Sequence, residues 1–344
     1  MSLFSRLFSK APAPVVHIES NDQPFTVNRG ETVLESALKN GISYPHDCTV
    51  GTCGACRTRL ISGKIEAITP FGYALSRDEL AGGYILACQA LAKTDLVINV
   101  DISQGAPITP TEQPARVVAI TDLTHDIKRF TIEIDKPLNY KAGQYANLTW
   151  GDAATSRSYS FANAPSAGGA QQLSFFIRHV PGGAFTDQLF NGDVAALPFR
   201  VNGPHGNFWL REGKGPILCL AGGSGLAPII SLLQDAANRR VRRDCTLLFG
   251  ARTPRDLYGD DELTAIRNAW TAGFDVWPVV AEPGTDDAAD RVRRGLVTEY
   301  IGAAIEKLGP GTQAYLCGPP GMIDAAIAAL IAHGIDIADI YYDK

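Results

Sequence analysis

Long apolar runs are missing from this chain of 344 residues. No stretch reaches the roughly 18–20 consecutive apolar residues that a membrane-spanning helix needs. The first ten residues have too short an apolar core for a signal peptide, and they contain no small-residue cleavage site. The sequence therefore predicts a cytoplasmic protein.

An excess of positive charge is also missing. The formal net charge is −5 and the pI is about 5.7, which argues against nucleic acid as a partner. No internal repeat or low-complexity segment is evident. At roughly 100–150 residues per domain, this length predicts two or three domains. We expect the protein to be a monomer.

Histidine is too sparse to build an oxygen-activating site. None of the six histidines pairs with another at a metal-binding spacing. Neither a Rieske-type Cys/His pairing nor a pattern of two histidines and one carboxylate is present. The sequence therefore excludes chemistry in which this chain activates oxygen by itself.

Cysteine is present in an odd number, seven, which argues against a disulfide framework in a cytoplasmic chain. Cys48, Cys53 and Cys56 lie within nine residues, and Cys88 follows at a distance. This C-x4-C-x2-C spacing with a distant fourth cysteine is that of plant-type 2Fe–2S centres. The alternatives are a structural zinc site or buried free thiols, but zinc sites usually use two C-x2-C units and this chain has one. We predict that Cys48, Cys53, Cys56 and Cys88 hold a 2Fe–2S cluster, whereas Cys219 and Cys245 are buried within strands.

The pattern of apolar residues changes along the chain. Short alternating runs such as Val117–Ile120 and Phe130–Ile134 predict an antiparallel barrel. After Gly213, apolar runs of strand length alternate with helical stretches, which predicts a parallel sheet with helices on both faces. The expected plan is a tail (1–14), a cysteine-bearing domain (15–103), a linker (104–113), a barrel domain (114–211) and a parallel-sheet domain (212–344).

Two segments of the predicted barrel have flavin-binding chemistry. The first is Arg157-Ser158-Tyr159-Ser160, in which an arginine can clamp a phosphate, a tyrosine offers a flat face and a serine can hydrogen-bond a flavin nitrogen. The second runs from Ile177 and Arg178 through Gly182 and Gly183 to Thr186. Its glycines let the backbone approach a pyrophosphate, and a helix begun near Ala184 would aim N–H groups at it. Each segment alone is a weak signal.

A glycine turn opens the parallel-sheet domain. Gly222-Gly223-Ser224-Gly225 follows an apolar strand and precedes a helical stretch. The turn is not G-x-G-x-x-G, and an ordinary strand-to-helix turn is the alternative. It nevertheless places glycines where a phosphate can sit at a helix N-terminus. Matching signals at other strand ends support a ligand site, and they include Arg252, Asp256-Leu257-Tyr258 and Cys317-Gly318-Pro319.

Taken in this order, the segments resemble three known modules. Residues 15–103 resemble a plant-type ferredoxin with a β-grasp fold. The barrel resembles the FAD-binding domain of the ferredoxin–NADP⁺ reductase superfamily, and the last part resembles its nicotinamide-binding domain. The whole chain, a multidomain α+β and α/β protein, resembles the single-chain reductase components of bacterial aromatic-ring and alkyl-side-chain oxygenases. Within that family it is most similar to the electron-transfer components of xylene monooxygenases.

The resemblance implies an oxidoreductase that passes electrons from NADH to FAD, then to a 2Fe–2S cluster, and finally to a partner non-haem iron oxygenase or hydroxylase component of aromatic or hydrocarbon degradation. It implies that Ser160 and Cys317 lie at the hydride-transfer centre. The cofactor-binding residues that it implies are Arg157, Tyr159, Ser160, Ile177, Arg178, Gly182, Gly183 and Thr186 for the flavin segments, and Gly222, Gly223, Gly225, Arg252, Cys317, Gly318 and Pro319 for the nicotinamide coenzyme.

Other functions share these modules. A reductase for a deoxysugar-forming iron–sulfur enzyme remains an alternative. A sodium-pumping NADH:quinone reductase would need a membrane helix, and a zinc-bearing adaptor would leave the flavin and nicotinamide motifs unexplained. The chain stops at Tyr341-Tyr342-Asp343-Lys344. Family members tend to continue for a few residues, so which tyrosine packs near the flavin stays open.

Two finer predictions concern the coenzyme and the tail. Arg252, Thr253 and Arg255 lie near the expected 2′-phosphate position, but Asp256 would repel a phosphate, which favours NADH over NADPH. In the tail, Leu3, Phe4, Leu7 and Phe8 would share one helix face, beside the cations Arg6 and Lys10. A disordered tail is the stronger expectation. Weak, reversible association with the inner-membrane surface is the alternative.

Overall fold

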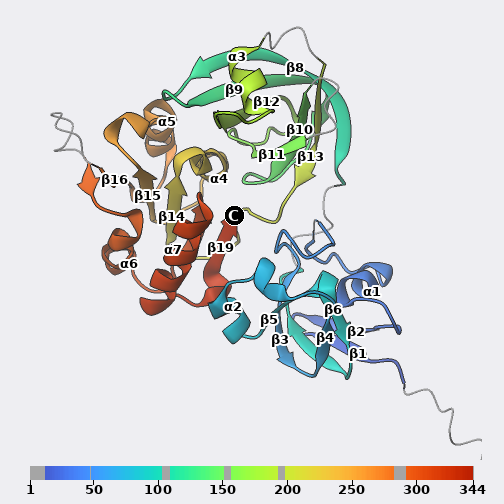
Figure 1. The fold of residues 1–344 in the computed structure, drawn as a ribbon. Coiled ribbons are helices and arrows are strands. Elements are labelled where there is room, and N and C mark those ends of the chain that lie inside the picture. Colours follow the sequence, from blue (N-terminus) through green and yellow to red (C-terminus); the bar gives the residue numbers. More distant parts are fainter. Residues whose placement is uncertain are drawn as a thin grey trace, which may run out of the picture. The chain divides into compact units, whose positions relative to one another are not determined.

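The computed structural model describes residues 12–46, 48–102, 109–150, 156–192, 198–282 and 292–343. The chain forms two compact units, Met1–Pro107 and Ile108–Lys344 (Figure 1). The apolar residues of the predicted tail helix and residues 104–108 of the predicted linker lie outside the described residues.

The first unit contains a five-stranded mixed sheet in the order β2-β1-β7-β3-β5, in which β1 and β7 are parallel. One helix, α1 (Val33–Lys39), buries Val33 and Leu34 in the core of this unit. The helix begins where it does because Thr32 and Glu35 form a capping box. This fold confirms the predicted ferredoxin-like domain. The other elements are β1 (Val15–Ile18), β2 (Asn21–Thr26), β3 (Arg57–Ser62), β4 (Ile65–Ala67), η2 (Phe71–Tyr73), α2 (Arg77–Ala81), β5 (Tyr84–Leu86), η3 (Ala87–Gln89), β6 (Ala90–Ala92) and β7 (Leu96–Asn99).

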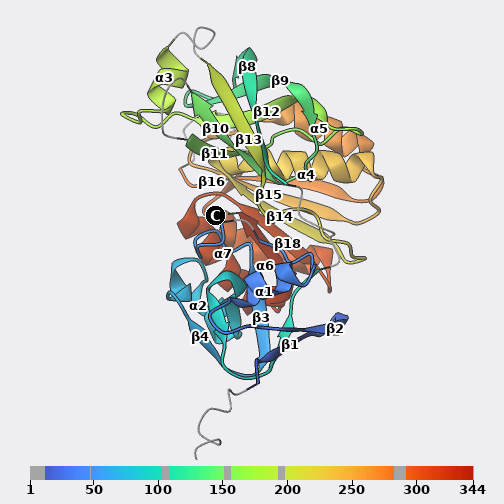
Figure 2. The ribbon, with the colours of Figure 1, turned by 90° about the vertical axis from the view of Figure 1, so that its right-hand side faces the viewer.

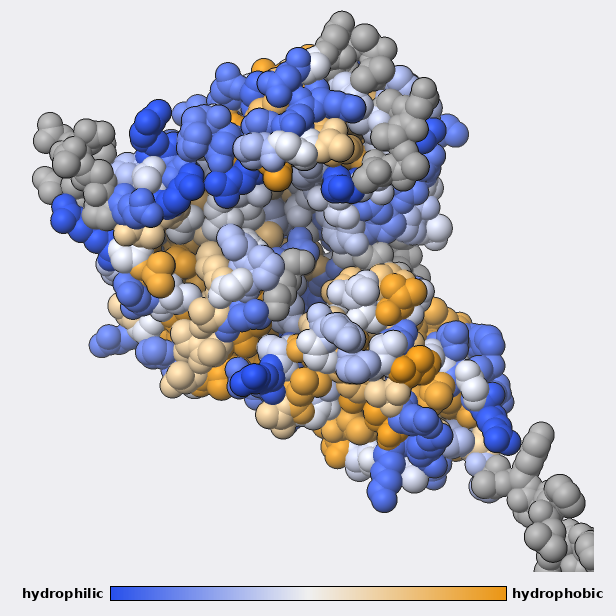
Figure 3. All heavy atoms as spheres, in the orientation of Figure 1, coloured by the Kyte–Doolittle hydropathy of each residue, from blue (hydrophilic) through white to orange (hydrophobic). Residues whose placement is uncertain are grey.

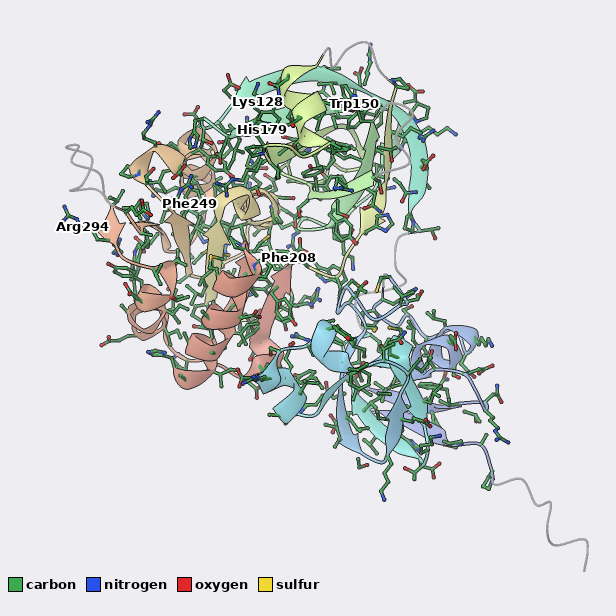
Figure 4. The ribbon with its side chains drawn as sticks, in the orientation of Figure 1. Lys128, Trp150, His179, Phe208, Phe249 and Arg294 are labelled. Atoms are coloured by element: carbon green, nitrogen blue, oxygen red, sulfur yellow. The ribbon has the colours of Figure 1, made fainter. Side chains whose placement is uncertain are left out.

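The second unit begins with a six-stranded antiparallel sheet in the order β11-β10-β13-β8-β9-β12. A bridge between Phe161 and Phe175 joins its two edges and so closes the sheet into a barrel. Alternate residues fill the interior, among them Phe130 and Trp150, and Figure 4 labels Trp150. The elements are β8 (Thr111–Asp122), β9 (Ile127–Leu138), β10 (Tyr145–Trp150), β11 (Ser156–Ser160), β12 (Ala170–Arg178), α3 (Thr186–Asn191) and β13 (Phe199–His205). The helix expected near Ala184 begins at Thr186, and β8 begins inside the range expected for the linker.

The rest of this unit is a parallel sheet in the order β17-β16-β15-β14-β18-β19. One apolar cluster packs α4 and α5 on one face, and a second packs α6 and α7 on the other, as Figure 2 shows. Cys219 and Cys245 are buried within strands, as predicted. The elements are β14 (Ile217–Gly222), η4 (Gly223–Gly225), α4 (Leu226–Asn238), β15 (Cys245–Ala251), η5 (Pro254–Asp256), α5 (Asp260–Ala269), β16 (Phe274–Val280), β17 (Arg293–Arg294), η7 (Val297–Tyr300), α6 (Ile301–Leu308), β18 (Gln313–Cys317), α7 (Pro320–Ala332), η8 (Ile337–Asp339) and β19 (Ile340–Asp343).

The strand order creates a switch point beside β14. The chain runs outward from β14 through β15 and β16, and then returns to β18 on the other side of β14. In open α/β sheets, ligands bind beyond the carboxyl ends of the strands at such a point. The glycine turn after β14 and the Cys317-Gly318-Pro319 turn after β18 both lie there.

Hydrogen bonds connect the barrel to helix α4. The Ser231 hydroxyl donates to the Asn163 carbonyl at 2.7 Å, and the Gln234 side chain accepts from the Ala164 N–H at 3.1 Å. Because α4 also packs on β14, these bonds position the barrel against the switch point of the sheet.

The surface of the second unit is uneven in polarity. In the view of Figure 3, side chains over α5 and β9 are mostly hydrophilic, whereas those over α6 and α7 are pale to orange. The alanine- and isoleucine-rich sequence of α7 accounts for its share of this apolar surface. Among the described residues, no helix is both long and apolar enough to cross a membrane.

Candidate functional site

The four predicted cluster cysteines lie together in the first unit as two pairs. The Cys53 N–H donates to Cys48 Sγ at 3.3 Å, and the Cys48 N–H donates to Cys53 Sγ at 3.4 Å. The Cys88 N–H donates to Cys56 Sγ at 3.5 Å. The loop therefore brings residues 48–56 and the distant Cys88 to one place.

The spacing of the sulfurs fits a binuclear cluster better than zinc. A tetrahedral zinc site with Zn–S bonds of about 2.3 Å would hold all four sulfurs about 3.8 Å apart. Across the part of the chain that the structure describes, no three of these sulfurs gather within 4.8 Å, since the one compact trio of metal-type ligands lies elsewhere. Four thiolates arranged as two pairs match the donor set of a 2Fe–2S cluster.

The conformation of the cysteine loop depends on its glycines. Gly51 and Gly54 have φ of +85° and +71°. A Cβ at Gly51 would lie 2.7 Å from the Gln89 side chain, so the position admits glycine alone without rearrangement. Burial raises the pKa of the Cys48 thiol, but hydrogen bonds from the side chains and N–H groups of Thr52 and Cys53 outweigh it and lower that pKa to about 6. Cys53 is exposed and Cys56 is buried, so the cluster edge at Cys53 is the accessible one.

A second site forms where the barrel meets the parallel sheet. The Ser160 hydroxyl, at the end of β11, donates to Asp343 Oδ2 at 3.1 Å. Strand β19 pairs with β18 so that Asp343 lies opposite Cys317. Burial raises the pKa of the Cys317 thiol well above its usual value, and the charge of Asp343 raises it further. The two predicted catalytic residues, Ser160 and Cys317, are therefore both neighbours of Asp343.

Asp343 is the residue that the sequence reasoning missed. It lies 183 positions from Ser160, and its strand has only four residues, too few for a periodic signal. The only available sign was an acidic residue after two tyrosines at the end of the chain.

The two terminal tyrosines support β19. Tyr341 stacks on Tyr315, with ring centroids 5.1 Å apart, and the Arg211 guanidinium lies 5.0 Å from the Tyr341 ring centroid. Tyr342 packs against the apolar cluster under α6 and α7. Their packing holds in place the strand that carries Asp343.

The two predicted flavin segments meet on the barrel. Tyr159 of β11 stacks on Phe185, just before α3, with centroids 5.9 Å apart. Burial raises the pKa of Tyr159 to about 12, so its hydroxyl stays protonated at neutral pH. Arg157 is exposed, and its guanidinium donates to the Ser156 carbonyl at 2.9 Å. The Tyr159–Phe185 contact places Tyr159 beside the Gly182–Thr186 loop.

That loop is tightly closed. The Thr186 hydroxyl lies 3.0 Å from both the N–H and the carbonyl of Val180. A Cβ at Gly183 would lie 2.8 Å from the Val180 carbonyl oxygen. His179 pairs with Asp187 at 2.6 Å and stacks on Phe190, and Figure 4 shows it beside α3. The main chain at Gly182, with φ of +76° and open space around it, remains accessible to a ligand.

Ile177 and Arg178 differ from the rest of the flavin segment. The Ile177 side chain is fully buried in the barrel core, so only its main chain can face a cofactor. The Arg178 side chain is exposed, and its Nε donates to Asp126 Oδ2 at 2.7 Å.

Glycines let the two turns at the switch point pack against each other. A Cβ at Gly225 would lie 2.4 Å from the Cys317 carbonyl oxygen, and one at Gly222 would lie 2.7 Å from Met322 Sδ. Gly318, with φ of +157°, approaches the Gly222 N–H, and Pro319 caps the start of α7. The predicted nicotinamide residues of both turns are therefore in one place.

Tyr258, in the loop before α5, supports the glycine turn. Its hydroxyl donates to the Gly223 carbonyl at 2.9 Å, and its ring is buried. Arg252 instead lies at the end of β15, with its Nε 3.8 Å from Asp256 Oδ2.

The Asp256 carboxylate, on which the prediction of NADH preference depends, is bound to Thr253. Its Oδ2 accepts from the Thr253 N–H at 2.8 Å and from the Thr253 hydroxyl at 2.9 Å. Its side chain is only 13% exposed. Any repulsion of a 2′-phosphate would act through its charge rather than by contact.

Models of three protein families match the chain in the predicted order. The 2Fe-2S iron-sulfur cluster binding domain matches residues 16–93, the oxidoreductase FAD-binding domain residues 114–209, and the oxidoreductase NAD-binding domain residues 219–327. The xylene/toluene monooxygenase electron transfer component of Pseudomonas putida is 39% identical over 344 residues, which cover 99% of this chain and 97% of that protein. The chain belongs to the family of reductase components of oxygenase systems. The predicted fold, oxidoreductase class and cofactors, namely FAD, a 2Fe–2S cluster and NADH, are confirmed.

Other members of this reductase family match over nearly their whole length. The phenol 2-monooxygenase reductase component of Pseudomonas sp. (strain CF600) is 34% identical, with 96% of this chain and 93% of that protein covered. The crystal structure of an Amycolatopsis cytochrome P450 reductase has a TM-score of 0.68 and 31% identity, over 96% of this chain and 98% of that one. A ferredoxin reductase in carbazole 1,9a-dioxygenase has a TM-score of 0.64, 30% identity and the same coverage.

Proposed function

We propose that this reductase takes electrons from NADH and delivers them to a separate oxygenase or hydroxylase component that acts on an aromatic or other hydrocarbon substrate. One observation carries the proposal: Ser160 of the barrel and Cys317 of the parallel sheet are both neighbours of Asp343. A nicotinamide and a flavin must meet face to face for hydride transfer, and among the described residues those proposed for both rings lie together here.

The resident groups supply the electron chemistry. When bound, FAD accepts the two electrons of a hydride and releases them singly, and the 2Fe–2S cluster carries one electron at a time. The residues of the chain itself position the reacting groups. Ser160 presents a hydroxyl whose orientation Asp343 controls, and Cys317 presents a neutral thiol because its pKa is raised.

The remaining residues are assigned to binding. We assign Arg157, Tyr159, Gly182, Gly183 and Thr186 to FAD, because the Tyr159–Phe185 contact brings both segments together. The nicotinamide coenzyme is assigned to the switch point, at Gly222, Gly223, Gly225, Cys317, Gly318 and Pro319, with Arg252 toward its adenosine end. The cluster is assigned to Cys48, Cys53, Cys56 and Cys88, and electrons would leave at the exposed Cys53 edge.

The first candidate partner is a non-haem iron oxygenase or hydroxylase. Its support is the 39% identity to a xylene/toluene monooxygenase component over nearly the whole chain. A haem-containing oxygenase of the cytochrome P450 type is a second candidate partner, because one solved relative of 31% identity is a cytochrome P450 reductase. A reductase role in deoxysugar formation remains an alternative without a supporting observation of its own.

Reconstitution tests the proposal. Purified holoprotein should show flavin and iron–sulfur absorbance, NADH should bleach both, and a hydroxylase encoded beside this gene should then form hydroxylated product. A cytochrome P450 encoded nearby, tested in parallel, distinguishes the two partner classes. Failure of NADH to bleach the flavin would refute the reductase function, whereas bleaching without product from either oxygenase would refute only the proposed partner.

A further inference from the structure

A second loop, residues 68–76, lies beside the cysteine loop in the first unit. The Gln89 side chain joins the two loops. Its Nε2 donates to the Thr49 carbonyl at 3.2 Å, and its Oε1 accepts from the Thr69 hydroxyl at 3.1 Å. Residues 68–76 therefore continue the surface that the cysteine loop presents.

Four apolar side chains on this surface are exposed to solvent. We call them the apolar rim, and they are Val50 at 63%, Ile68 at 53%, Tyr73 at 83% and Pro70. The residue after Tyr73 reaches the cysteine loop, because the Ala74 carbonyl oxygen lies 3.9 Å from the position of a Cβ on Gly54. Gly54 follows the exposed Cys53, so the apolar rim borders the accessible edge of the cluster site.

The two loops of the apolar rim contain no charge. Residues 48–56 and 68–76 include no Asp, Glu, Lys or Arg. The charge just before the second loop is balanced, since Glu66 pairs with Lys93. Contiguous apolar side chains exposed on a protein surface mark interaction sites. This surface therefore fits an apolar, uncharged partner rather than an ionic one.

The position of the apolar rim favours an electron acceptor as the occupant. The rim borders the cluster edge, and a lipid surface there would receive no electron. The FAD-binding domain that supplies electrons is part of the same chain, so covalent linkage already gives it a high effective concentration. A separate acceptor has no such linkage, and its affinity must come from surface contacts.

We propose that the apolar rim is the docking surface for the electron-accepting oxygenase component, and that it binds an apolar, uncharged face of that protein. The inference rests on the proposed function, which supplies the acceptor. Four side chains cover less than the roughly 800 Å² per partner of a stable interface, and electron-transfer encounters lie at the small end of that range. The complex is therefore weak and transient.

Binding of the hydroxylase encoded beside this gene tests the proposal, or of the nearby cytochrome P450 if only that protein accepts electrons. Surface plasmon resonance on the oxidised holoprotein gives the dissociation constant. We expect this constant to rise about tenfold in Tyr73→Ser and in Ile68→Ser, as it does when an interface anchor is lost. The acceptor concentration for half-maximal reoxidation of the NADH-reduced protein should rise in parallel, with the maximal rate unchanged.

Salt dependence tests the chemistry of the surface. Raising NaCl from about 0.05 to about 0.5 M should change the wild-type dissociation constant less than about twofold, because the apolar rim has no charges to screen.

Ile61→Ser is the matched control. Ile61 is 45% exposed in the same unit, but it lies near the far end of β3, whose first residue follows Cys56. Five residues along a strand place it about 16 Å from that ligand, so acceptor affinity should not change. Tyr73→Leu keeps an apolar side chain and should retain most of the wild-type affinity. Iron content and the reduction of both cofactors by NADH should match the wild type in every variant.

Several results would overturn the inference. One is unchanged acceptor affinity in both Tyr73→Ser and Ile68→Ser. Another is a wild-type affinity that falls more than about tenfold with salt, which would show docking through charges. Slower reduction of the cluster by NADH, with acceptor affinity unchanged, would assign the apolar rim to the flavin-bearing unit instead.

The remaining occupants are distinguished in the same way. Loss of binding to phosphatidylcholine vesicles in Ile68→Ser, with acceptor affinity unchanged, would assign the apolar rim to a lipid surface. Loss of self-association, again with acceptor affinity unchanged, would assign it to a second copy of the chain. If NADH reduces the wild-type protein but neither oxygenase accepts its electrons, the proposed partner fails, and this inference fails with it.

Discussion

At the scale of single residues, Asp343 joins modules that are far apart in the sequence. Its carboxylate accepts a hydrogen bond from Ser160 and raises the pKa of the Cys317 thiol. A buried thiol that stays neutral places no charge against a nicotinamide ring. The carboxylate also limits the rotation of the Ser160 hydroxyl. In the proposed hydride-transfer site, the geometry therefore depends on Asp343.

Asp343→Asn should slow reduction of the flavin by NADH about ten- to a hundredfold, because misplacing one positioned group in an active site has an effect of this size. Ser160→Ala should slow it similarly, since it removes the other partner of the same bond. Stopped-flow bleaching of the flavin measures the step. Asp339→Asn, an identical change just before β19, serves as the control. If NADH bleaches the flavin of Asp343→Asn at the wild-type rate, Asp343 has no role in hydride transfer.

The charge of Asp256 should still bias the coenzyme choice. We expect kcat/KM to be higher for NADH than for NADPH, because a 2′-phosphate near this carboxylate is repelled. Asp256→Asn keeps a side-chain acceptor for Thr253 and removes the charge, so the preference should shrink. Equal kcat/KM for both coenzymes in the wild type would contradict the prediction.

At the scale of elements, the active region depends on two strand-to-helix turns that pack together. Gly225, between β14 and α4, touches the main chain of the turn after β18. Strand order makes this possible, because β14 and β18 are neighbours although nearly a hundred residues separate them. Neither turn can accept a side chain at its contact point without moving the other.

Gly225→Ala should therefore raise the KM for NADH and lower stability by about 1–3 kcal/mol, the usual cost of overpacking. The new Cβ would lie 2.4 Å from the Cys317 carbonyl oxygen. Gly321→Ala is the matched control, since that Cβ meets nothing within 4 Å and lies in the first turn of α7. Thermal melting and NADH kinetics measure both variants. Equal melting temperatures and equal KM values for the two variants would show that the turn accommodates the added methyl group.

At the scale of the whole molecule, the chain divides into a cluster-bearing unit and a unit with the barrel and the parallel sheet. Each unit buries apolar side chains of its own, such as Leu34 and Leu96 in the first and Leu220 in the second, so loss of one cofactor need not disturb the other. This division predicts that the two halves of the electron path can be separated by mutation.

Cys56→Ser should remove iron and abolish reduction of cytochrome c, because a buried ligand of the cluster is lost. NADH should still bleach the flavin at the wild-type rate, since the segments that match the FAD- and NAD-binding domains lie in the second unit. Iron analysis, cytochrome c reduction and flavin bleaching on one preparation provide the test. A flavin that no longer reduces would show that the path is not serial.

The N-terminal tail should associate weakly, if at all, with membranes. Four apolar side chains would contribute about 1.5–3 kcal/mol each if fully buried. Ordering about ten residues of backbone costs about 1–2 kcal/mol each, which offsets that gain. Cosedimentation with anionic liposomes compares the intact chain with one lacking residues 1–13. Equal pelleting would show that the tail is not an anchor.

Local patterns in the sequence sufficed for the features that depend on neighbouring residues. The cysteine spacing and the glycine turns each act within a few positions, so they predicted the cluster loop and the phosphate-type turn. Contacts between residues far apart in the chain came only from the tertiary structure. Asp343 reaches Ser160 because β19 pairs beside β18, and Arg178 reaches Gly223 because one face of β12 packs on the parallel sheet. Such contacts depend on which strands become neighbours, and that is decided by the burial of whole apolar faces rather than by any local motif.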